Sequence, residues 1–218
     1  MSILIYNDDG VSSDSANALL HYFRDENARF VTAADLRKNS WIFDTKLLIV
    51  PGGRSLPYYE KLGKAGNNNI ISYVGQGGTY WGFCAGAYYA CTKTLFSEGL
   101  PLELKLPGEL HFFEGRAIGP VFADAEFAYG SESGARIVDV IWKDESTHAV
   151  YFNGGCYFEH AEAFKNTEIL SVYASNKKPA IIACTYGKGR AILSGVHPEL
   201  SPSTILLSHF RKLERVKS

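Results

Sequence analysis

The sequence of 218 residues has no long apolar run and almost no net charge. No apolar segment approaches the roughly 20 residues that a membrane-spanning helix needs. The formal net charge of -1 gives no basic surplus of the kind that nucleic acids or membrane surfaces attract. The N-terminal stretch from Met1 to Asp8 lacks a basic region and turns polar after a few apolar residues, unlike a secretory signal. We therefore expect neither nucleic acid nor a membrane as partner.

The four cysteines show no Cys-x-x-Cys spacing and form no ligand pattern with the six histidines. A zinc site or a paired redox motif is therefore not expected, and we predict no metal and no other cofactor. This cysteine usage fits a reduced, cytoplasmic setting. Internal repeats and low-complexity tracts are also missing. With 46% hydrophobic and 21% charged residues, the length and composition suit a single globular domain spanning residues 1–218.

Short β-prone runs alternate with helical patterns through the first 92 residues. Strands are predicted at 2–6, 29–33, 46–50 and 79–83. A first helix is predicted to begin at a cap formed by Ser12, Ser13 or Asp14 and to carry the apolar residues at 18–23, and further helices are predicted at 54–61, 69–74 and 85–92, with a loop at 63–68. Consecutive strand–helix units favour parallel strands, because each helix carries the chain back over the sheet. The pattern therefore predicts an α/β fold with a mostly parallel sheet and helices on both faces.

The pattern changes between residues 101 and 158, where strands at 110–115, 136–142 and 148–153 are separated by Gly, Pro and charged turns. Without a linker on either side, this stretch predicts an antiparallel extension around 108–158 and not a separate domain. A further antiparallel pair is expected at 169–174 and 180–186. The strand at 190–196 and a helix at 204–213 complete the chain.

One sharp corner is predicted where the strand at 79–83 meets the next helix. Gly82 and Gly86 flank Cys84 as Gly-x-Cys-x-Gly, the thiol version of the turn that exposes a nucleophilic serine. The free N–H groups at the start of the following helix favour a thiolate. The alternative is a buried cysteine in a glycine-rich turn, since free cysteines are often buried. The motif alone leaves both readings open.

Two other strand ends carry residues that suit thiol chemistry. The strand at 190–196 leads into His197-Pro198-Glu199, and a thiol nucleophile needs a histidine to take its proton and a carboxylate to orient the imidazole. The strand at 46–50 ends in Gly52 and Gly53, whose exposed N–H groups suit a developing oxyanion, although a plain turn would also place glycines there. Only the fold can bring these strand ends to Cys84.

Taken in order, the stretches 50–53, 82–86 and 195–199 resemble the class I glutamine amidotransferase-like superfamily. Longer matches resemble the amidotransferase-like N-terminal domain of biotin-protein ligases, which also occurs as a stand-alone protein; they lie at 51–59, 77–86, 113–120, 129–135 and 151–155. The resemblance implies a three-layer, flavodoxin-like fold. It also implies a catalytic triad of Cys84, His197 and Glu199. An oxyanion hole is implied as well, formed by the backbone N–H groups of Gly52 or Gly53 and of Ala85.

The resemblance implies acyl transfer through a thioester, by a cysteine-dependent hydrolase or amidotransferase acting on an unidentified amide or ester. Tyr88 stands where glutaminases of the superfamily carry a glutamine, so glutamine is not assumed; Tyr88, Asn153 and Gly154 are candidate substrate-binding residues. We expect a small-molecule or peptide substrate, and no biotin ligation by this chain alone. The alternative is a non-catalytic binding or regulatory module on the same fold, linked to biotin or to a protein partner in biotinylation.

Overall fold

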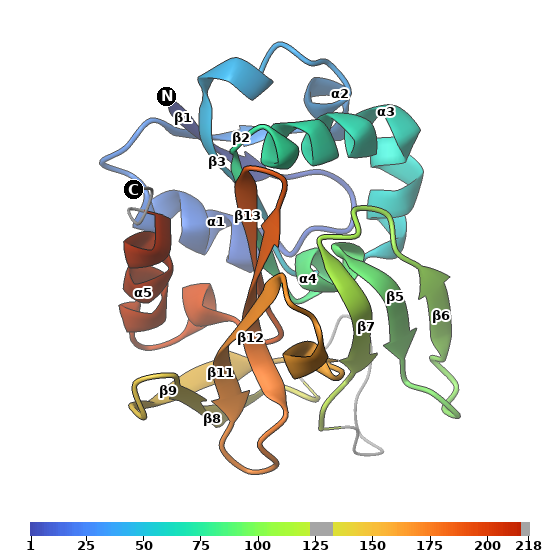
Figure 1. Cartoon of the computed structure of the whole chain (residues 1–218), viewed down its shortest axis with the longest axis vertical. Helices are drawn as coiled ribbons and strands as arrows, with labels where there is room; N and C mark the ends of the chain where they lie inside the picture. The colour runs from blue at the N-terminus through green and yellow to red at the C-terminus, as the bar shows by residue number, and fades with distance from the viewer. Residues whose placement is uncertain (123–132, 215–218) are drawn as a thin grey trace.

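All five residues of strand β1 (Ser2–Tyr6) are buried, and their side chains enter two separate cores. Ile3 and Ile5 pack in the core that includes residues of helices α1 (Ser13–Tyr22) and α5 (Ile205–Glu214). Leu4 and Tyr6 belong to the core on the opposite face, which includes residues of α2 (Ala33–Leu36) and α3 (Leu56–Gly75). Because strand side chains alternate between faces, this strand is covered by helices on both sides (Figure 1). The computed structural model describes residues 1–122 and 133–214.

The main sheet has nine strands in the order β2-β1-β3-β4-β13-β12-β11-β8-β9. The strands from β2 to β13 are parallel to their neighbours, and the pairings from β13 to β9 are antiparallel. Their bounds are Ala28–Val31 (β2), Thr45–Val50 (β3), Thr79–Phe83 (β4), Arg136–Trp142 (β8), Thr147–Phe152 (β9), Thr167–Tyr173 (β11), Pro179–Tyr186 (β12) and Gly189–Ser194 (β13). The predicted α/β class with a parallel sheet and an antiparallel extension is confirmed.

A second sheet of four strands, in the order β10-β7-β5-β6, was not predicted. Its strands are Cys91–Phe96 (β5), Leu104–Pro107 (β6), Phe113–Gly119 (β7) and Tyr157–Phe158 (β10). Residues 108–158 are therefore divided: β8 and β9 extend the main sheet, whereas β7 and β10 join the second one. Of the resembling stretch 129–135, residues 129–132 lie outside the described residues.

Two helices differ from the sequence prediction. The stretch 63–68 is helical and not a loop, and only Gly63, at φ 55°, departs from helical geometry within α3. Helix α4 (Ala85–Tyr89) is shorter than predicted, because the chain from Cys91 onward pairs with β6 and β7 as strand β5. None of the helices in the described ranges combines the length and hydropathy needed to cross a membrane.

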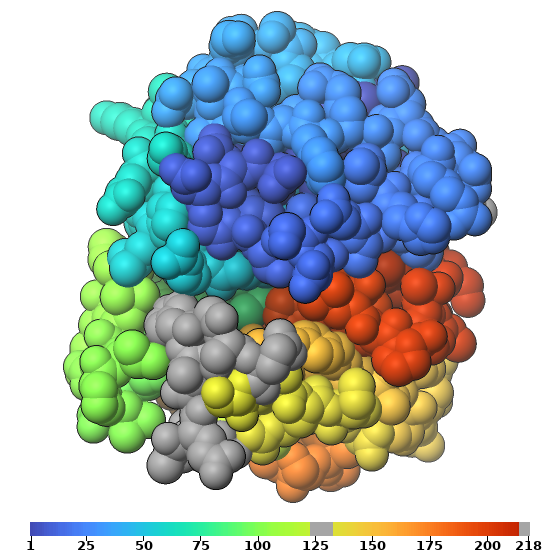
Figure 2. All heavy atoms as spheres, turned by 180° about the vertical axis from the view of Figure 1, so that it is seen from behind, coloured from blue at the N-terminus to red at the C-terminus, as the bar shows by residue number. Residues whose placement is uncertain are grey.

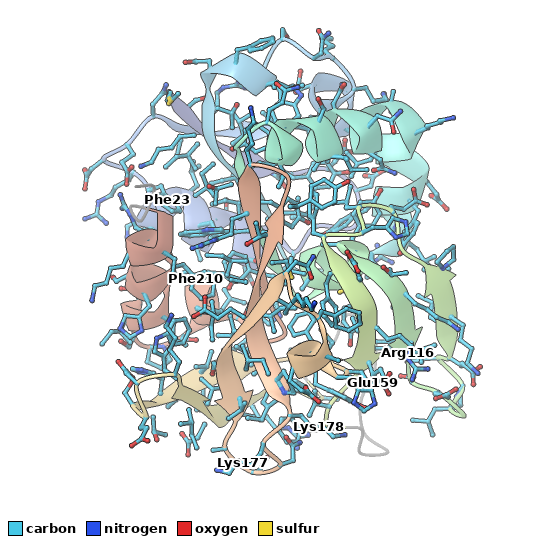
Figure 3. All side chains as sticks on the ribbon, in the orientation of Figure 1. Phe23, Arg116, Glu159, Lys177, Lys178 and Phe210 are labelled. Atoms are coloured by element: carbon cyan, nitrogen blue, oxygen red, sulfur yellow. The ribbon has the colours of Figure 1, made fainter. Side chains whose placement is uncertain are left out.

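Aromatic side chains fix α5 against the sheet. The Trp81 ring lies with its centroid 5.8 Å from Phe23 and 5.4 Å from Phe210, and Figure 3 shows both phenylalanines on the side of the molecule that carries α5. On the other side, Arg116 in β7 pairs with Glu159 just after β10, also labelled in Figure 3. Side-chain contacts thus hold α5 on one side of the molecule and the end of β10 against β7 on the other.

Candidate active site

Cys84 occupies a strained corner between β4 and α4. Its φ of 44° lies in the left-handed region, which is rarely adopted by residues other than glycine. The flanking glycines are required sterically: a Cβ at Gly86 would overlap the Val50 carbonyl, and one at Gly82 would lie 2.6 Å from the Gly86 carbonyl oxygen. Cys84 N–H donates to the Ser194 carbonyl of β13 at 2.8 Å. The backbone at Cys84 therefore forms the sharp strand-to-helix corner that the sequence predicts.

His197 follows β13, which lies beside β4 in the sheet. Its backbone N–H donates to the Tyr151 carbonyl at 2.9 Å, and its carbonyl accepts from Ser201 Oγ at 2.7 Å. Glu199 lies in the short 3-10 helix η3 (Pro198–Leu200), and its Oε1 is 2.8 Å from His197 Nδ1. Both side chains are almost completely buried. The backbone therefore orients the imidazole before any substrate arrives.

The surroundings of His197 favour its charged form. Burial alone would lower the pKa of His197, but the Glu199 carboxylate and hydrogen bonds with Cys84 and Glu199 outweigh this and raise the pKa to about 10. The structure thus brings the predicted thiol, imidazole and carboxylate together. The Cys84 thiol also donates to the Asn153 carbonyl, with Sγ 3.7 Å from the oxygen.

The other thiols lie in different surroundings. Cys91, Cys156 and Cys184 are fully buried, and burial raises the pKa of each. A thiol held in its neutral form is a poor nucleophile. Cys84, in contrast, is 6% exposed and lines a cavity.

Ser15, in α1, is a site residue that sequence analysis missed. Its Oγ donates to Glu199 Oε1 at 2.6 Å and accepts from Gly52 N–H at 3.3 Å. The serine therefore links the carboxylate to the loop after β3. Glu199 Oε2 is buried without a hydrogen-bond partner in the described part of the chain, so Oε1 carries the interactions that hold this carboxylate.

Gly52 and Gly53, the two candidate glycines of the oxyanion hole, differ in whether their backbone N–H groups are already hydrogen-bonded. The Gly52 amide is taken up by Ser15, and a Cβ at Gly52 would overlap the His197 ring. Within residues 1–122 and 133–214, the N–H groups of Gly53 and Ala85 have no hydrogen-bond partner. Both of these residues line the cavity beside Cys84. The free pair of donors is therefore Gly53 and Ala85.

The cavity has a volume of about 390 Å³. It is lined by residues from several strand ends: Gly10, Val11, Ser12, Ser13, Asp14, Gly53, Arg54, Ser55, Cys84, Ala85, Tyr88, Thr94, Phe96, Leu104, Tyr151, Asn153, Gly154, His197 and Leu200. Figure 2 shows the face on which the blue N-terminal residues border the red C-terminal residues. All three candidate substrate-binding residues, Tyr88, Asn153 and Gly154, line this cavity.

Tyr88 joins α4 to the loop after β9. Its hydroxyl donates to the Gly154 carbonyl at 3.1 Å, and its ring packs edge-on against Phe96. The tyrosine thus fixes one wall of the cavity as well as lining it.

In the described ranges, no three His, Cys, Asp or Glu side chains cluster as metal ligands would.

Comparison with known proteins agrees with this architecture. Residues 1–217 match the family described as "Biotin-protein ligase, N terminal". The chain is 36% identical over 216 residues to a biotin–protein ligase of Schizosaccharomyces pombe, covering 92% of this chain and 34% of the ligase. An uncharacterized protein of Chlamydia muridarum is 35% identical over 210 residues, covering 92% of this chain and 81% of that protein.

Solved structures show the same fold at low sequence identity. A glutamine amidotransferase crystal structure superposes with a TM-score of 0.68 at 20% identity, covering 99% of this chain and 100% of that one. PurLQS from Thermotoga maritima gives a TM-score of 0.63 at 13% identity, covering 97% and 98% of the two chains. The chain therefore has a glutamine amidotransferase-like fold and belongs to the biotin-protein ligase N-terminal family.

Proposed function

We propose that the chain is a cysteine-dependent hydrolase or amidotransferase that acts on an amide or ester through a thioester intermediate. The observation that carries the proposal is geometric: Nδ1 of the buried His197 lies 2.8 Å from Glu199 Oε1, and the His197 ring and the Cys84 side chain both border Gly52. Imidazolium beside a thiol stabilises the thiolate, which is the nucleophilic form. A module that only bound a ligand would have no chemical need for this arrangement.

The reaction follows from the positions of the groups. Cys84 Sγ bonds to the carbonyl carbon, and the carbonyl π electrons move onto oxygen, where the Gly53 and Ala85 N–H groups stabilise the charge. Loss of one such donor costs about 2.7–4 kcal/mol in known oxyanion holes. The C–N or C–O bond then breaks, and the His197 proton goes to the departing amine or alcohol.

The thioester is resolved by a second nucleophile. His197, now neutral, accepts the proton of a water or amine that attacks the thioester carbonyl. The C–S bond breaks, the acid or new amide leaves, and the Cys84 sulfur and the proton on His197 are restored to their starting state. Glu199 keeps the imidazole oriented through Nδ1 in both half-reactions.

An activated ester tests the proposal without knowledge of the natural substrate. The protein is mixed with 4-nitrophenyl acetate at pH 7, and intact-protein mass spectrometry records any acetyl adduct. We expect a burst of nitrophenol and a transient acetyl group on Cys84, both lost in Cys84→Ser and strongly slowed in His197→Ala. If Cys84 reacts like an ordinary thiol and His197→Ala changes nothing, the alternative of a non-catalytic binding module on this fold replaces the proposal.

A further inference from the structure

We propose that Tyr58 is a positioning residue of the acyl transfer: its hydroxyl fixes the peptide between Gly52 and Gly53, so that the Gly53 N–H is aimed at the substrate carbonyl oxygen before any substrate binds. The inference rests on the proposed function, because it concerns the oxyanion donor of the same site. It is carried by the hydrogen bonds that surround this one peptide.

The Gly52 carbonyl and the Gly53 N–H belong to one trans peptide unit. In a planar trans peptide these two groups point in opposite directions, so whatever holds the carbonyl also sets the direction of the N–H. The Ser12 N–H donates to the Gly52 carbonyl at 2.8 Å. The Gly53 N–H therefore points away from the segment that contains Ser12.

The pairing of Gly53 with Val11 agrees with this direction. The two residues form an isolated antiparallel bridge, whose hydrogen bonds of 2.8 and 2.7 Å are made by the residues on either side of the pair. In such a pair the N–H groups of the two paired residues face away from each other. A Cβ at Gly53 would lie 2.1 Å from the Gly10 carbonyl oxygen, so this close approach requires a glycine. The Gly53 N–H is thus left for a ligand in the cavity that Gly53 lines.

Tyr58, in the first turn of α3, also holds this loop. Its hydroxyl lies 3.2 Å from the carbonyl oxygens of both Pro51 and Gly52 and donates its one proton between them. A single hydrogen bond leaves a peptide plane free to tilt about it, and the Ser12 bond alone would allow this tilt. Because the Tyr58 hydroxyl reaches two consecutive carbonyls, it restrains the plane of the peptide and with it the direction of the Gly53 N–H.

The Tyr58 ring is itself fixed in place. It is completely buried, and it packs edge-on against Tyr6 and Tyr89, with centroid distances of 5.3 and 6.0 Å. Burial, together with the neighbouring Cys84 and Tyr6, raises the pKa of the Tyr58 hydroxyl well above its usual value. The hydroxyl therefore keeps its proton, and remains a donor, throughout the neutral and mildly alkaline range.

Two reactions of Cys84 separate the oxyanion donor from the thiol itself. With 4-nitrophenyl acetate the sulfur bonds to the carbonyl carbon and nitrophenolate leaves, through an intermediate whose oxyanion the Gly53 N–H stabilises. With iodoacetamide the sulfur displaces iodide from a methylene carbon, and no oxyanion forms. Peptide mapping assigns both products to Cys84. The acylation rate divided by the alkylation rate, normalised by the same ratio for 2-mercaptoethanol, cancels differences in thiol reactivity.

We expect the normalised ratio of the unaltered protein to exceed one. Tyr58→Phe, which keeps the ring, should lower it by about fivefold, the size of one hydrogen bond, while alkylation by iodoacetamide continues at the original rate. The matched control is Tyr73→Phe, because Tyr73 is also buried and its hydroxyl donates to the Thr79 carbonyl at the other end of β4. This control should leave the ratio unchanged.

A normalised ratio near one in the unaltered protein would overturn the inference. The same ratio in Tyr58→Phe as in the unaltered protein would also overturn it, including the case in which both rates fall together because the fold has loosened. Failure of the proposed function is a separate result. If Cys84 alkylates like an ordinary thiol and His197→Ala changes nothing, while the ratio still depends on Tyr58, the positioning of the Gly53 N–H stands and the acyl-transfer proposal falls.

Discussion

Ser15 and Glu199, 184 positions apart in the sequence, share a buried hydrogen bond of 2.6 Å between Oγ and Oε1. Through it the first helix of the fold fixes the carboxylate that orients His197. The same serine hydroxyl accepts the Gly52 N–H. One hydroxyl thus sets the relative position of the acid and of the loop that supplies the Gly53 donor.

Replacing Ser15 by alanine should therefore cost both stability and reactivity. The change leaves the Gly52 N–H without its partner and removes one donor from Glu199, so the free energy of unfolding should fall by about 1–3 kcal/mol. Urea unfolding measures this loss, and iodoacetamide labelling of Cys84 reports the reactivity. The control is Asn17→Ala, on an exposed residue of the same helix outside the cavity lining; equal losses in the two variants would argue against the link.

Replacing Gly52 by alanine should impair the site while the fold survives. The new Cβ would overlap the His197 ring and lie 3.4 Å from the Cys84 Cβ, so the imidazole must move away from the thiol. We expect labelling of Cys84 at pH 7 to slow by about tenfold or more, as general-base contributions suggest. Gly75→Ala, where the nearest atom would be 3.8 Å away, should label normally. Normal labelling of Gly52→Ala would contradict the geometry.

His197 should remain protonated above neutral pH. Its pKa is raised from 6.5 to about 10 against the effect of burial, by Glu199 and by Cys84. A raised folded-state pKa means that the imidazolium stabilises the fold fully below about pH 6.5 and that this contribution is lost as pH rises toward 10. An NMR titration of the histidine ring carbons gives the midpoint. A midpoint near 6.5 would remove the electrostatic basis of the proposed mechanism.

Replacing Glu199 by glutamine tests the charge separately from the shape. The amide oxygen can still accept from His197 Nδ1, but the negative charge that raises the pKa of His197 is lost. The histidine midpoint should fall, and alkylation of Cys84 at pH 7 should slow. Comparison with Glu162→Gln, an exposed acid beside His160, isolates the effect of position. An unchanged histidine midpoint in Glu199→Gln would show that the carboxylate does not control the imidazole.

The sequence predicted the local parts of this site and missed those set by distant pairing. Cys84 and its glycines form a corner within one short stretch, and His197 and Glu199 share one loop. Both motifs can therefore be recognised in the sequence. Ser15 was missed because a serine near a helix start is commonly a cap. Its actual partners, Gly52 and Glu199, are neighbours only in the folded chain.

The same distinction explains the errors in the fold. Helix α4 was extended to residue 92 because its small and aromatic residues continue a helical pattern, whereas pairing with β7 turns Cys91–Phe96 into a strand. The loop expected at 63–68 was inferred from its glycines and asparagines. In the structure one left-handed glycine, Gly63, is enough to kink a helix that otherwise continues. Tertiary contacts decided both cases.

The central position of β13 has a consequence for folding. Strands β4 and β13 are far apart in the sequence, yet they pair directly in the sheet. Because Cys84 follows β4 and His197 follows β13, the two side chains come together only once this long-range pairing has formed, and pairings of that kind form slowly.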